Sequence, residues 1–220
     1  MNAALILSGG VGARFGASVP KQYTRIRRKM VIEYVIEAAM QAKSADVVLV
    51  AGADCPQLRQ LQKKHGFRTA NGGATRNETL LNGLTALRDL GCERVVILDA
   101  VRPLVTGELI DEYLRLLAGG WDAVSTVQPI TDSLGCLDCH EVDRSRYYLM
   151  QSPEGYDLVK LLQYFDPNSP LTEVAHQLPA DSKIHLYRDF PENPKLTYPW
   201  EKMAIAQALK EKGNKENRRP

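Results

Sequence analysis

Short apolar runs alternate with amphipathic segments over the first part of the chain. Residues 3–7 (AALIL) and 46–52 (DVVLVAG) are apolar runs next to glycine, a pattern typical of buried strands. Residues 31–39 place apolar side chains at i, i+1, i+4, i+5 and i+8, which predicts an amphipathic helix. Similar patterns predict strands at 67–69, 94–99 and 122–127 and helices at 55–64, 76–90 and 106–117. Strands that are apolar on both faces and alternate with helices predict a parallel sheet covered on both sides.

The alternation breaks after Gln128. Residues 129–151 are polar, carry Asp and Gly at several positions and contain short β-like pieces, so we expect a β-arm that leaves the sheet. Beyond it we expect helices at 155–164, 172–178 and 198–210, a strand at 183–187 and a frayed tail at 211–220. The pattern predicts an α/β fold in a single domain over residues 1–220: a Rossmann-like, mostly parallel sheet with helices on both faces and a protruding β-arm.

The composition limits the classes of protein to which the chain can belong. Its 220 residues are 44% hydrophobic and 25% charged, with a formal net charge of +2, the balance of an ordinary globular domain. So small a charge does not indicate nucleic acid as an obligatory partner. No apolar window approaches the length of a transmembrane helix, about 18 residues. The N-terminus lacks the basic segment of an export signal, so we expect a cytoplasmic protein.

Cys136, Cys139 and His140 have the C-x-x-C-H spacing of haem attachment, or of half a zinc site. Haem attachment requires export, and a zinc site requires a second pair of ligands. The remaining cysteines, Cys55 and Cys92, are isolated in the sequence and do not supply that pair. We therefore interpret the motif as an accidental pair of reduced thiols.

A glycine-rich segment follows the first predicted strand directly. Glycines there let backbone N–H groups approach an anion closely, because no Cβ intervenes. Gly10 and Gly12 fit the dinucleotide fingerprint G-x-G-x-x-G, but the third glycine, Gly16, comes one position late, and Pro20 interrupts the helix that should follow. The Gly-Lys-Ser/Thr end of a P-loop is absent. Three interpretations stay open on these residues alone: a dinucleotide site, a loop whose cations lie beside a polyphosphate, and a plain βα turn.

Six segments, in order along nearly the whole chain, resemble one known family. They are 7–15 (LSGGVGARF) with 20–23 (PKQY), 72–79 (GGATRNET), 98–103 (LDAVRP), 142–144 (VDR) with 152–153 (SP), 171–173 (LTE), and 193–197 (NPKLT). Together they resemble the cytidylyltransferase family that contains 2-C-methyl-D-erythritol 4-phosphate cytidylyltransferase and ribitol-5-phosphate cytidylyltransferase. One match is weak, but six in the family's order identify the chain as a member.

The resemblance implies a CTP-dependent nucleotidyltransferase that moves CMP onto a small phosphorylated polyol and releases pyrophosphate. Catalysis of such a reaction is mostly positioning and neutralisation of charge on the phosphoryl groups. By resemblance Arg14 and Lys21 lie along the triphosphate, and Lys195 reaches the α-phosphate and the incoming oxygen. Asp99, at the end of a predicted strand, is the expected ligand of a Mg²⁺ ion that bridges phosphates. The plain alternatives are a strand-end cap for Asp99 and surface cations for the basic residues.

The resemblance also assigns the nucleotide site. Backbone groups and small side chains would surround the cytosine, where bulk would exclude the ring. The residues implied are Ser8, Gly9, Gly10, Gly12, Gly73, Arg76 and Thr79.

On the acceptor side the resemblance implies a homodimer in which the β-arm of a second subunit completes the site. The residues implied are Arg102, Ser133, Arg144, Ser152 and Thr172, with Ser133 and Arg144 acting across the interface. Ser133 and Ser152 stand where relatives usually have threonine, Glu154 where they have glutamine and Glu173 where they have aspartate. These departures leave the acceptor open between 2-C-methyl-D-erythritol 4-phosphate, of isoprenoid synthesis, and a ribitol- or glycerol-phosphate, of wall or capsule synthesis. An NAD-dependent dehydrogenase and a non-catalytic dimeric scaffold are the rival functions.

Overall fold

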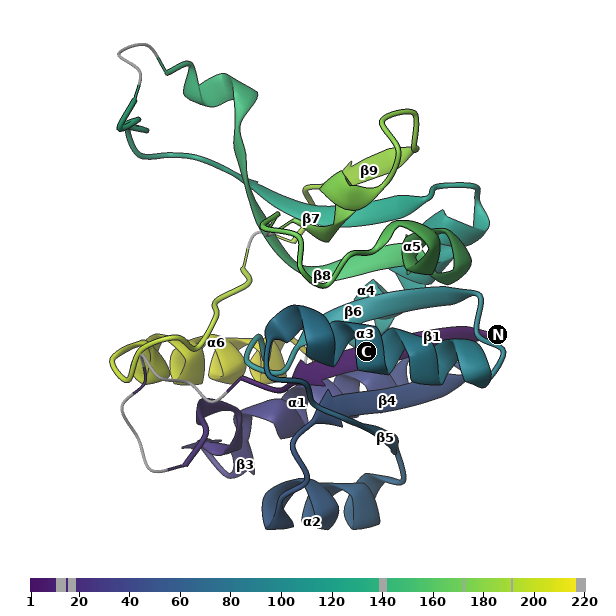
Figure 1. Ribbon diagram of the computed structural model, residues 1–220. Coiled ribbons are helices and arrows are strands. Elements are labelled where there is room, and N and C mark those ends of the chain that lie inside the picture. The colour runs from purple at the N-terminus through teal and green to yellow at the C-terminus, as the bar shows by residue number, and fades with distance from the viewer. Residues whose placement is uncertain (11–14, 16–18, 139–141, 172, 191, 217–220) are drawn as a thin grey trace.

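A seven-stranded sheet forms the centre of the protein (Figure 1). The structure is a computed structural model, and it describes residues 1–10, 15, 19–138, 142–171, 173–190 and 192–216. The strand order is β5-β4-β1-β6-β8-β7-β9. The strands are β1 (Asn2–Ser8), β4 (Val47–Gly52), β5 (Arg68–Asn71), β6 (Arg94–Asp99), β7 (Ala123–Pro129), β8 (Tyr148–Asp157) and β9 (Ile184–Tyr187). β8 is antiparallel to both β6 and β7, and the other pairings are parallel. The predicted fold class, a mostly parallel α/β sheet, is confirmed.

The first strand shows why the apolar runs of the sequence are continuous. Ala4 and Ile6 of β1 pack into the core on one face of the sheet, whereas Ala3 and Leu5 pack into the core on the other face. Successive side chains of a strand point to opposite faces, so a strand that is covered on both faces is apolar at every position.

Helices cover both faces of the sheet. The helices are α1 (Val31–Gln41), α2 (Pro56–His65), α3 (Arg76–Asp89), α4 (Gly107–Ala118), α5 (Leu158–Tyr164) and α6 (Glu201–Glu216). α1, α2 and α4 supply apolar side chains to one core, and α3 and α5 supply them to the opposite core. Thr75 and Thr106 cap α3 and α4, since each hydroxyl accepts a hydrogen bond from a backbone N–H of the first turn. None of the described helices is long and apolar enough to cross a membrane.

Two helices predicted in the second half differ from the structure. The helix expected at 155–164 begins only at Leu158, because β8 continues through Gly155 and Tyr156, which pair with β6 and β7. A Cβ on Gly155 would lie 3.2 Å from Leu117 and 3.3 Å from Tyr113, so the glycine lets α4 pack closely on the strand. The helix expected at 172–178 is a single short 3₁₀ turn, η4 (Val174–Gln177).

The C-terminal helix is also longer than expected. α6 begins at Glu201 and continues to Glu216, so residues 211–216 are helical where the sequence predicted a frayed tail. The Lys212 ammonium donates to the carbonyl oxygens of Leu104 and Val105, at 3.4 and 3.0 Å, which ties this part of the helix to the loop after β6. Ile205 and Leu209 are buried in a third, smaller core.

The connection between β7 and β8 projects from the sheet at the upper left of Figure 1. The two strands stay paired out to Pro129 and Tyr148, beyond a register shift at Ser125 and Thr126. In the segment 129–151, where the sequence predicts a β-arm, residues 148–151 form the start of β8 and pair with β7. In the described part of the connection lies one 3₁₀ turn, η3 (Arg144–Arg146). Near the other end of the chain, η2 (Lys21–Tyr23) precedes a two-stranded sheet of β2 (Arg25–Ile26) and β3 (Lys29–Met30).

Candidate active site

The site lies where the parallel strands β1, β4 and β6 end. Ser8 at the end of β1 is in register with Gly52 of β4, and Leu7 is in register with Asp99 of β6. The carboxyl ends of these strands share one edge of the sheet, which is where open α/β sheets bind ligands. The sequence-predicted residues Ser8, Gly9, Gly10 and Asp99 are brought to this edge.

The glycine-rich loop that follows β1, here called the first loop, is held at its start by residues of η2. The Gln22 side-chain amide donates to the carbonyl oxygens of Ser8 and Gly10, at 2.9 and 3.1 Å. The Tyr23 hydroxyl lies 3.4 Å from Ser8 Oγ, and burial raises the pKa of Tyr23, so this phenol stays protonated as a hydrogen-bonding group. Lys21, the first residue of η2, is half-buried. These contacts fix the path of the described start of the loop.

The first loop packs against a second loop that precedes α3. A Cβ on Gly9 would lie 2.4 Å from Thr79 Oγ1, and one on Gly73 would lie 2.2 Å from Glu78 Cβ, so both positions require glycine. The Gly73 N–H donates to Thr79 Oγ1 at 3.0 Å, and the same hydroxyl donates to the Thr75 carbonyl at 2.9 Å. Thr79 is buried, and its hydroxyl holds the second loop in shape.

Asp99 is the centre of a group of cations. Its Oδ2 lies 2.9 Å from Lys195 Nζ and 3.4 Å from Arg102 Nε. Burial alone would raise the pKa of Asp99, but the charges of Lys195, Arg76 and Arg102 outweigh it and hold the pKa below its ordinary value. The carboxylate is therefore ionised and able to act as an oxygen ligand.

The segment that carries Lys195 is tied to the sheet by Asn193. The Arg102 guanidinium donates to the Asn193 carbonyl at 2.5 Å, and Asn193 Nδ2 donates to the Ser152 carbonyl at 2.6 Å. Ser152 Oγ in turn accepts a hydrogen bond of 2.8 Å from the Asp99 N–H. Arg102 and Ser152, expected to bind the acceptor, thus also join β6, β8 and the Lys195 segment into one unit.

Glu154 of β8 adds a second buried carboxylate beside Asp99. Its Oε1 lies 3.4 Å from Arg76 Nη2, and its Oε2 accepts a hydrogen bond of 2.6 Å from the Tyr156 hydroxyl. Burial raises the pKa of Glu154, Arg76 and Tyr156 lower it, and the negative charge of Asp99 raises it further; the net direction is upward. Arg76, predicted as a nucleotide-binding residue, thus contacts Glu154 and also experiences the negative charge of Asp99.

Ser133 and Arg144, the described residues predicted in the arm, have no hydrogen bond or ion pair with this group. Arg144 is exposed and donates to the carbonyl oxygens of Thr131 and Asp132 inside the arm, and Ser133 is exposed in the same arm. The predicted site residues Gly12, Arg14 and Thr172 lie outside the described residues, as do Cys139 and His140 of the C-x-x-C-H motif.

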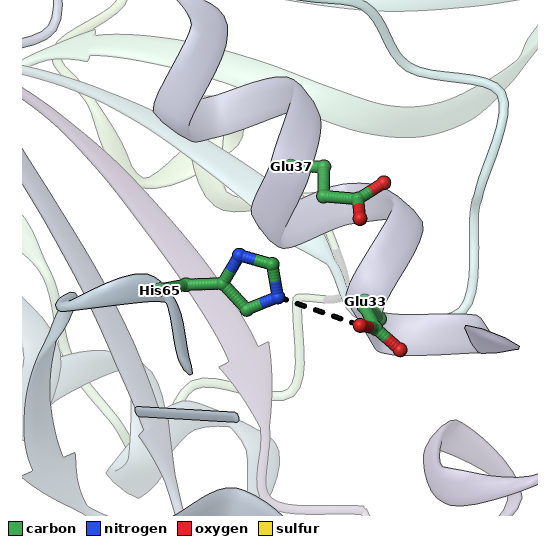
Figure 2. A group of neighbouring side chains, drawn as sticks. All are labelled: Glu33, Glu37 and His65. Atoms are coloured by element: carbon green, nitrogen blue, oxygen red, sulfur yellow. Dashed lines mark hydrogen bonds and ion pairs between the residues drawn. The ribbon is translucent and has the colours of Figure 1, made fainter. Parts of the chain in front are cut away.

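A separate group of possible metal ligands lies between α1 and α2. Figure 2 shows Glu33, Glu37 and His65, whose ligand atoms lie within 4.8 Å of one another. Each carboxylate already has an ammonium partner at 2.6 Å: Lys64 beside Glu33 and Lys29 beside Glu37. We interpret this group as an ion-pair network that joins the two helices, because both negative charges are already compensated.

Sequence reasoning assigned no role to three residues that shape the site: Gln22, Asn193 and Tyr156. Gln22 and Asn193 stand inside segments that carried the family resemblance, so that signal was available. Tyr156 carried no such signal, since its hydroxyl gains a role only through contact with Glu154.

Comparison with known proteins finds relatives over most of the chain. A 2-C-methyl-D-erythritol 4-phosphate cytidylyltransferase of Neorickettsia sennetsu is 29% identical, over 90% of this chain and 93% of its own length. A D-ribitol-5-phosphate cytidylyltransferase of Rattus norvegicus is 28% identical over 97% of this chain, which spans only 53% of that relative. A solved 4-diphosphocytidyl-2C-methyl-D-erythritol synthase of Anaerococcus prevotii shares the fold, with a TM-score of 0.81 at 20% identity, over 95% of this chain and 96% of that one.

The family pattern decides between the open interpretations. The pattern described as IspD, 2-C-methyl-D-erythritol 4-phosphate cytidylyltransferase, matches residues 2–210. The match supports neither the dehydrogenase nor the non-catalytic scaffold. It shows that the chain is an enzyme, a nucleotidyltransferase that acts on CTP and a phosphorylated polyol. The chain belongs to the IspD cytidylyltransferase family.

Proposed function

We propose that this edge of the sheet binds CTP and a small polyol phosphate and joins CMP to the acceptor phosphate. One observation carries the proposal: an ionised Asp99 has Lys195, Arg102 and Arg76 around it, at the edge of the sheet where hydrogen bonds hold Ser8, Gly10 and Gly73. Fixed cations next to accessible backbone N–H groups are suited to phosphate binding.

The nucleotide would lie across the two loops. Ser8, Gly9, Gly10 and Gly73 would surround the cytosine, with Gly12 and Arg14 completing the first loop along the triphosphate. Thr79 supports this pocket by fixing Gly73, and the missing Cβ of Gly9 keeps the loops close together. Lys21 would lie beside the triphosphate, as the family resemblance implies.

In the reaction an oxygen of the acceptor phosphate attacks the α-phosphorus of CTP. A new oxygen–phosphorus bond forms as the bond to the bridging oxygen of the β-phosphate breaks, and pyrophosphate leaves with that electron pair. Lys195, paired with Asp99 at 2.9 Å, would turn to the α-phosphoryl oxygens as their negative charge grows. Arg14 and Lys21 would stabilise the departing pyrophosphate.

A divalent cation would fit at Asp99 when Lys195, its partner at 2.9 Å, turns to the phosphates and frees that carboxylate oxygen. Mg²⁺ is commonly held by one or two carboxylates together with substrate phosphates, and Asp99 supplies one ionised carboxylate. Mg²⁺ would neutralise charge on the phosphates when bound. The chain's own part is to keep Asp99 ionised, which the three surrounding cations do.

The acceptor phosphate would lie on the β8 side of Asp99. Ser152, Thr172, Arg102 and Lys195 would hold it from the same subunit. Arg144 and Ser133 would come from the arm of a second subunit, since in one subunit Arg144 is bonded within the projecting arm. We therefore propose that the active enzyme is a homodimer, with all 220 residues of each subunit in a single nucleotidyltransferase domain.

The acceptor is a small phosphorylated polyol. It is 2-C-methyl-D-erythritol 4-phosphate or a ribitol phosphate, as in the names of the two relatives, or a glycerol phosphate. The test is pyrophosphate release with CTP, Mg²⁺ and each acceptor in turn, with ATP, UTP and GTP as nucleotide controls. We expect release with CTP and one acceptor, and its loss in Lys21→Ala. CTP binding without release on any acceptor would overturn the acceptor class, and absence of CTP binding would overturn the proposed function.

A further inference from the structure

Lys195 lies in the segment 192–197, which has no regular secondary structure. Its side chain is 40% exposed, and its ammonium lies 2.9 Å from Asp99 Oδ2. A lysine side chain is long and flexible, so the place of its charge depends on how firmly the backbone beneath it is held. The contacts of the residues on either side of Lys195 therefore decide where the ammonium can reach.

Two hydrogen bonds to backbone groups hold this segment to the loop after β6. On the far side of Lys195, the Leu196 N–H donates to the Val101 carbonyl at 2.9 Å, and the Leu196 side chain is wholly buried. On the near side, the Asn193 carbonyl accepts a hydrogen bond of 2.5 Å from the Arg102 guanidinium. Lys195 thus lies between two points at which the chain is attached to the same loop.

The side chain of Asn193 attaches the segment to a second element, β8. Its Nδ2 donates to the Ser152 carbonyl at 2.6 Å and to Gln151 Oε1 at 3.0 Å, and the residue is buried. Both hydrogens of the amide therefore have an acceptor, which fixes its orientation. Pro194 follows directly and restricts the backbone of Asn193 to extended conformations. A supporting side chain locked in this way can hold its segment within the narrow geometry that a site needs.

We propose that Asn193 is a positioning residue for Lys195: its amide, bonded to β8, sets the place from which the Lys195 ammonium reaches the reacting phosphate. This inference rests on the proposed function and adds a residue that acts through Lys195, not on the substrate. Arg102 bonds to the backbone carbonyl of Asn193, so a change of the side chain tests the amide apart from that contact.

Without the amide, the chain before Lys195 would be held through its backbone alone. A displacement of about 1 Å at a reacting centre can lower a rate by up to about a hundredfold. Lys195 is proposed to stabilise charge that grows on the α-phosphoryl oxygens during the reaction. Loss of its position should therefore appear in kcat and not in the binding of CTP.

The experiment measures steady-state pyrophosphate release by the full-length chain. Asn193→Leu removes both donors and keeps a similar size; we expect kcat to fall about ten- to a hundredfold, with the KM for CTP within about twofold of wild type. In a Lys195→Met background the same substitution should cause no further loss, because Asn193 acts through Lys195. Gln151→Leu, which removes one of the two acceptors, should lower kcat by about threefold.

The matched control is Asn2→Leu, which removes an amide that also donates to a backbone carbonyl, that of Ser44, at the end of β1 opposite the site. It should leave kcat unchanged. Wild-type kcat in Asn193→Leu would overturn the positioning role, as would a change in the KM for CTP alone or a loss that persists in the Lys195→Met background.

The melting curve of each variant shows whether it folds. If Asn193→Leu does not fold, Gln151→Leu decides the question: wild-type kcat in that variant overturns the role. Failure of the wild-type chain itself to release pyrophosphate would instead overturn the proposed reaction, and this role with it, before any variant is compared.

Discussion

Glu33 and Glu154 are both buried glutamates, with side chains 7% and 6% exposed, and each has a half-exposed cation beside it. Glu33 lies between α1 and α2, and Glu154 lies at the edge of the sheet that forms the site. Burial raises the pKa of Glu33, but hydrogen bonds from Lys64 and His65 bring it below the ordinary value. For Glu154 burial prevails, and the pKa is raised.

The difference comes from the closeness of the cation and from the negative charges that act on each glutamate. Lys64 contacts Glu33 at 2.6 Å, whereas Arg76 contacts Glu154 at 3.4 Å and also experiences the charge of Asp99. The negative charges of Asp99 and Glu173 act on Glu154 as well. A structural ion pair such as that of Glu33 can be optimised for stability alone. The charges of a binding site are only partly compensated in the free protein, because the charged substrate compensates the rest when it binds.

The largest expected effect is on Lys195, a cation of the site. Lys195→Met should lower kcat/KM by about two to three orders of magnitude, because one charge that stabilises the phosphoryl group is lost. Its melting temperature should stay close to wild type, since Asp99 keeps Arg102 as a partner. Steady-state pyrophosphate release measures the first quantity and calorimetry the second.

The control is Lys64→Met, which removes the cation next to Glu33 instead. It should lower the melting temperature and leave kcat/KM unchanged. If the two lysine variants lost activity to the same extent, the distinction between the two regions would fail.

The second effect is on stability at the α1–α2 contact. Glu33→Gln should lower the free energy of unfolding by about 2 kcal/mol, because a buried acceptor loses its charge-assisted hydrogen bonds to Lys64 and His65. Urea denaturation measures this loss, and activity per folded molecule should not change.

The loss should depend on pH in a definite direction. The pKa of Glu33 is lower in the folded state than its ordinary value of 4.5, so the stabilisation is present above that value and disappears as the pH falls through the folded pKa. The wild type and Glu33→Gln should therefore converge in acid. Curves that stay parallel from neutral pH into acid would show that Glu33 contributes only through packing.

A smaller effect is expected at Ser152, where the site is held by an uncharged group. Ser152→Ala should lower the free energy of unfolding by about 1 kcal/mol, because the Asp99 N–H loses its hydrogen bond. A drop in kcat/KM should accompany it, since this backbone N–H belongs to Asp99, whose carboxylate contacts Lys195. Ser152→Thr, which keeps the hydroxyl, is the control and should retain most of both quantities.

The smallest effect has the opposite sign. Because the pKa of Glu154 is raised in the folded state, its charged form costs stability at neutral pH, and protonation relieves that cost as the pH falls. Glu154→Gln should therefore raise the melting temperature slightly at neutral pH, with a gain that shrinks towards pH 4.5. A melting temperature that falls would place Glu154 with Glu33, as a residue that serves stability.

Much of the fold could be predicted from local patterns. The run 3–7 and the stripe over 31–39 correspond to β1 and α1, because side-chain periodicity is set by the backbone geometry of each element. The glycines of both loops could be found from the family segments, which contain Gly9 and Gly73. Only the structure shows that a Cβ at either position would strike a neighbour.

Prediction failed where packing decided the structure. Residues 155–157 were expected in a helix but form the end of β8, since their partners are β6 and β7. Residues 211–216 were expected to fray but are helical, and Lys212 contacts Leu104 and Val105, over 100 residues away. No local pattern records such partners.

The sequence by itself determined the alternation of elements, the positions that require glycine, and the family to which the chain belongs. The tertiary structure alone decided that Arg76 and Glu154, 78 residues apart, form a pair close to Asp99. The physical reason is that periodicity and turn chemistry act between near neighbours. The electrostatic field at Asp99 depends on the order of the strands in the sheet. β8 lies between β6 and β7 and brings Glu154 to the edge where β6 ends.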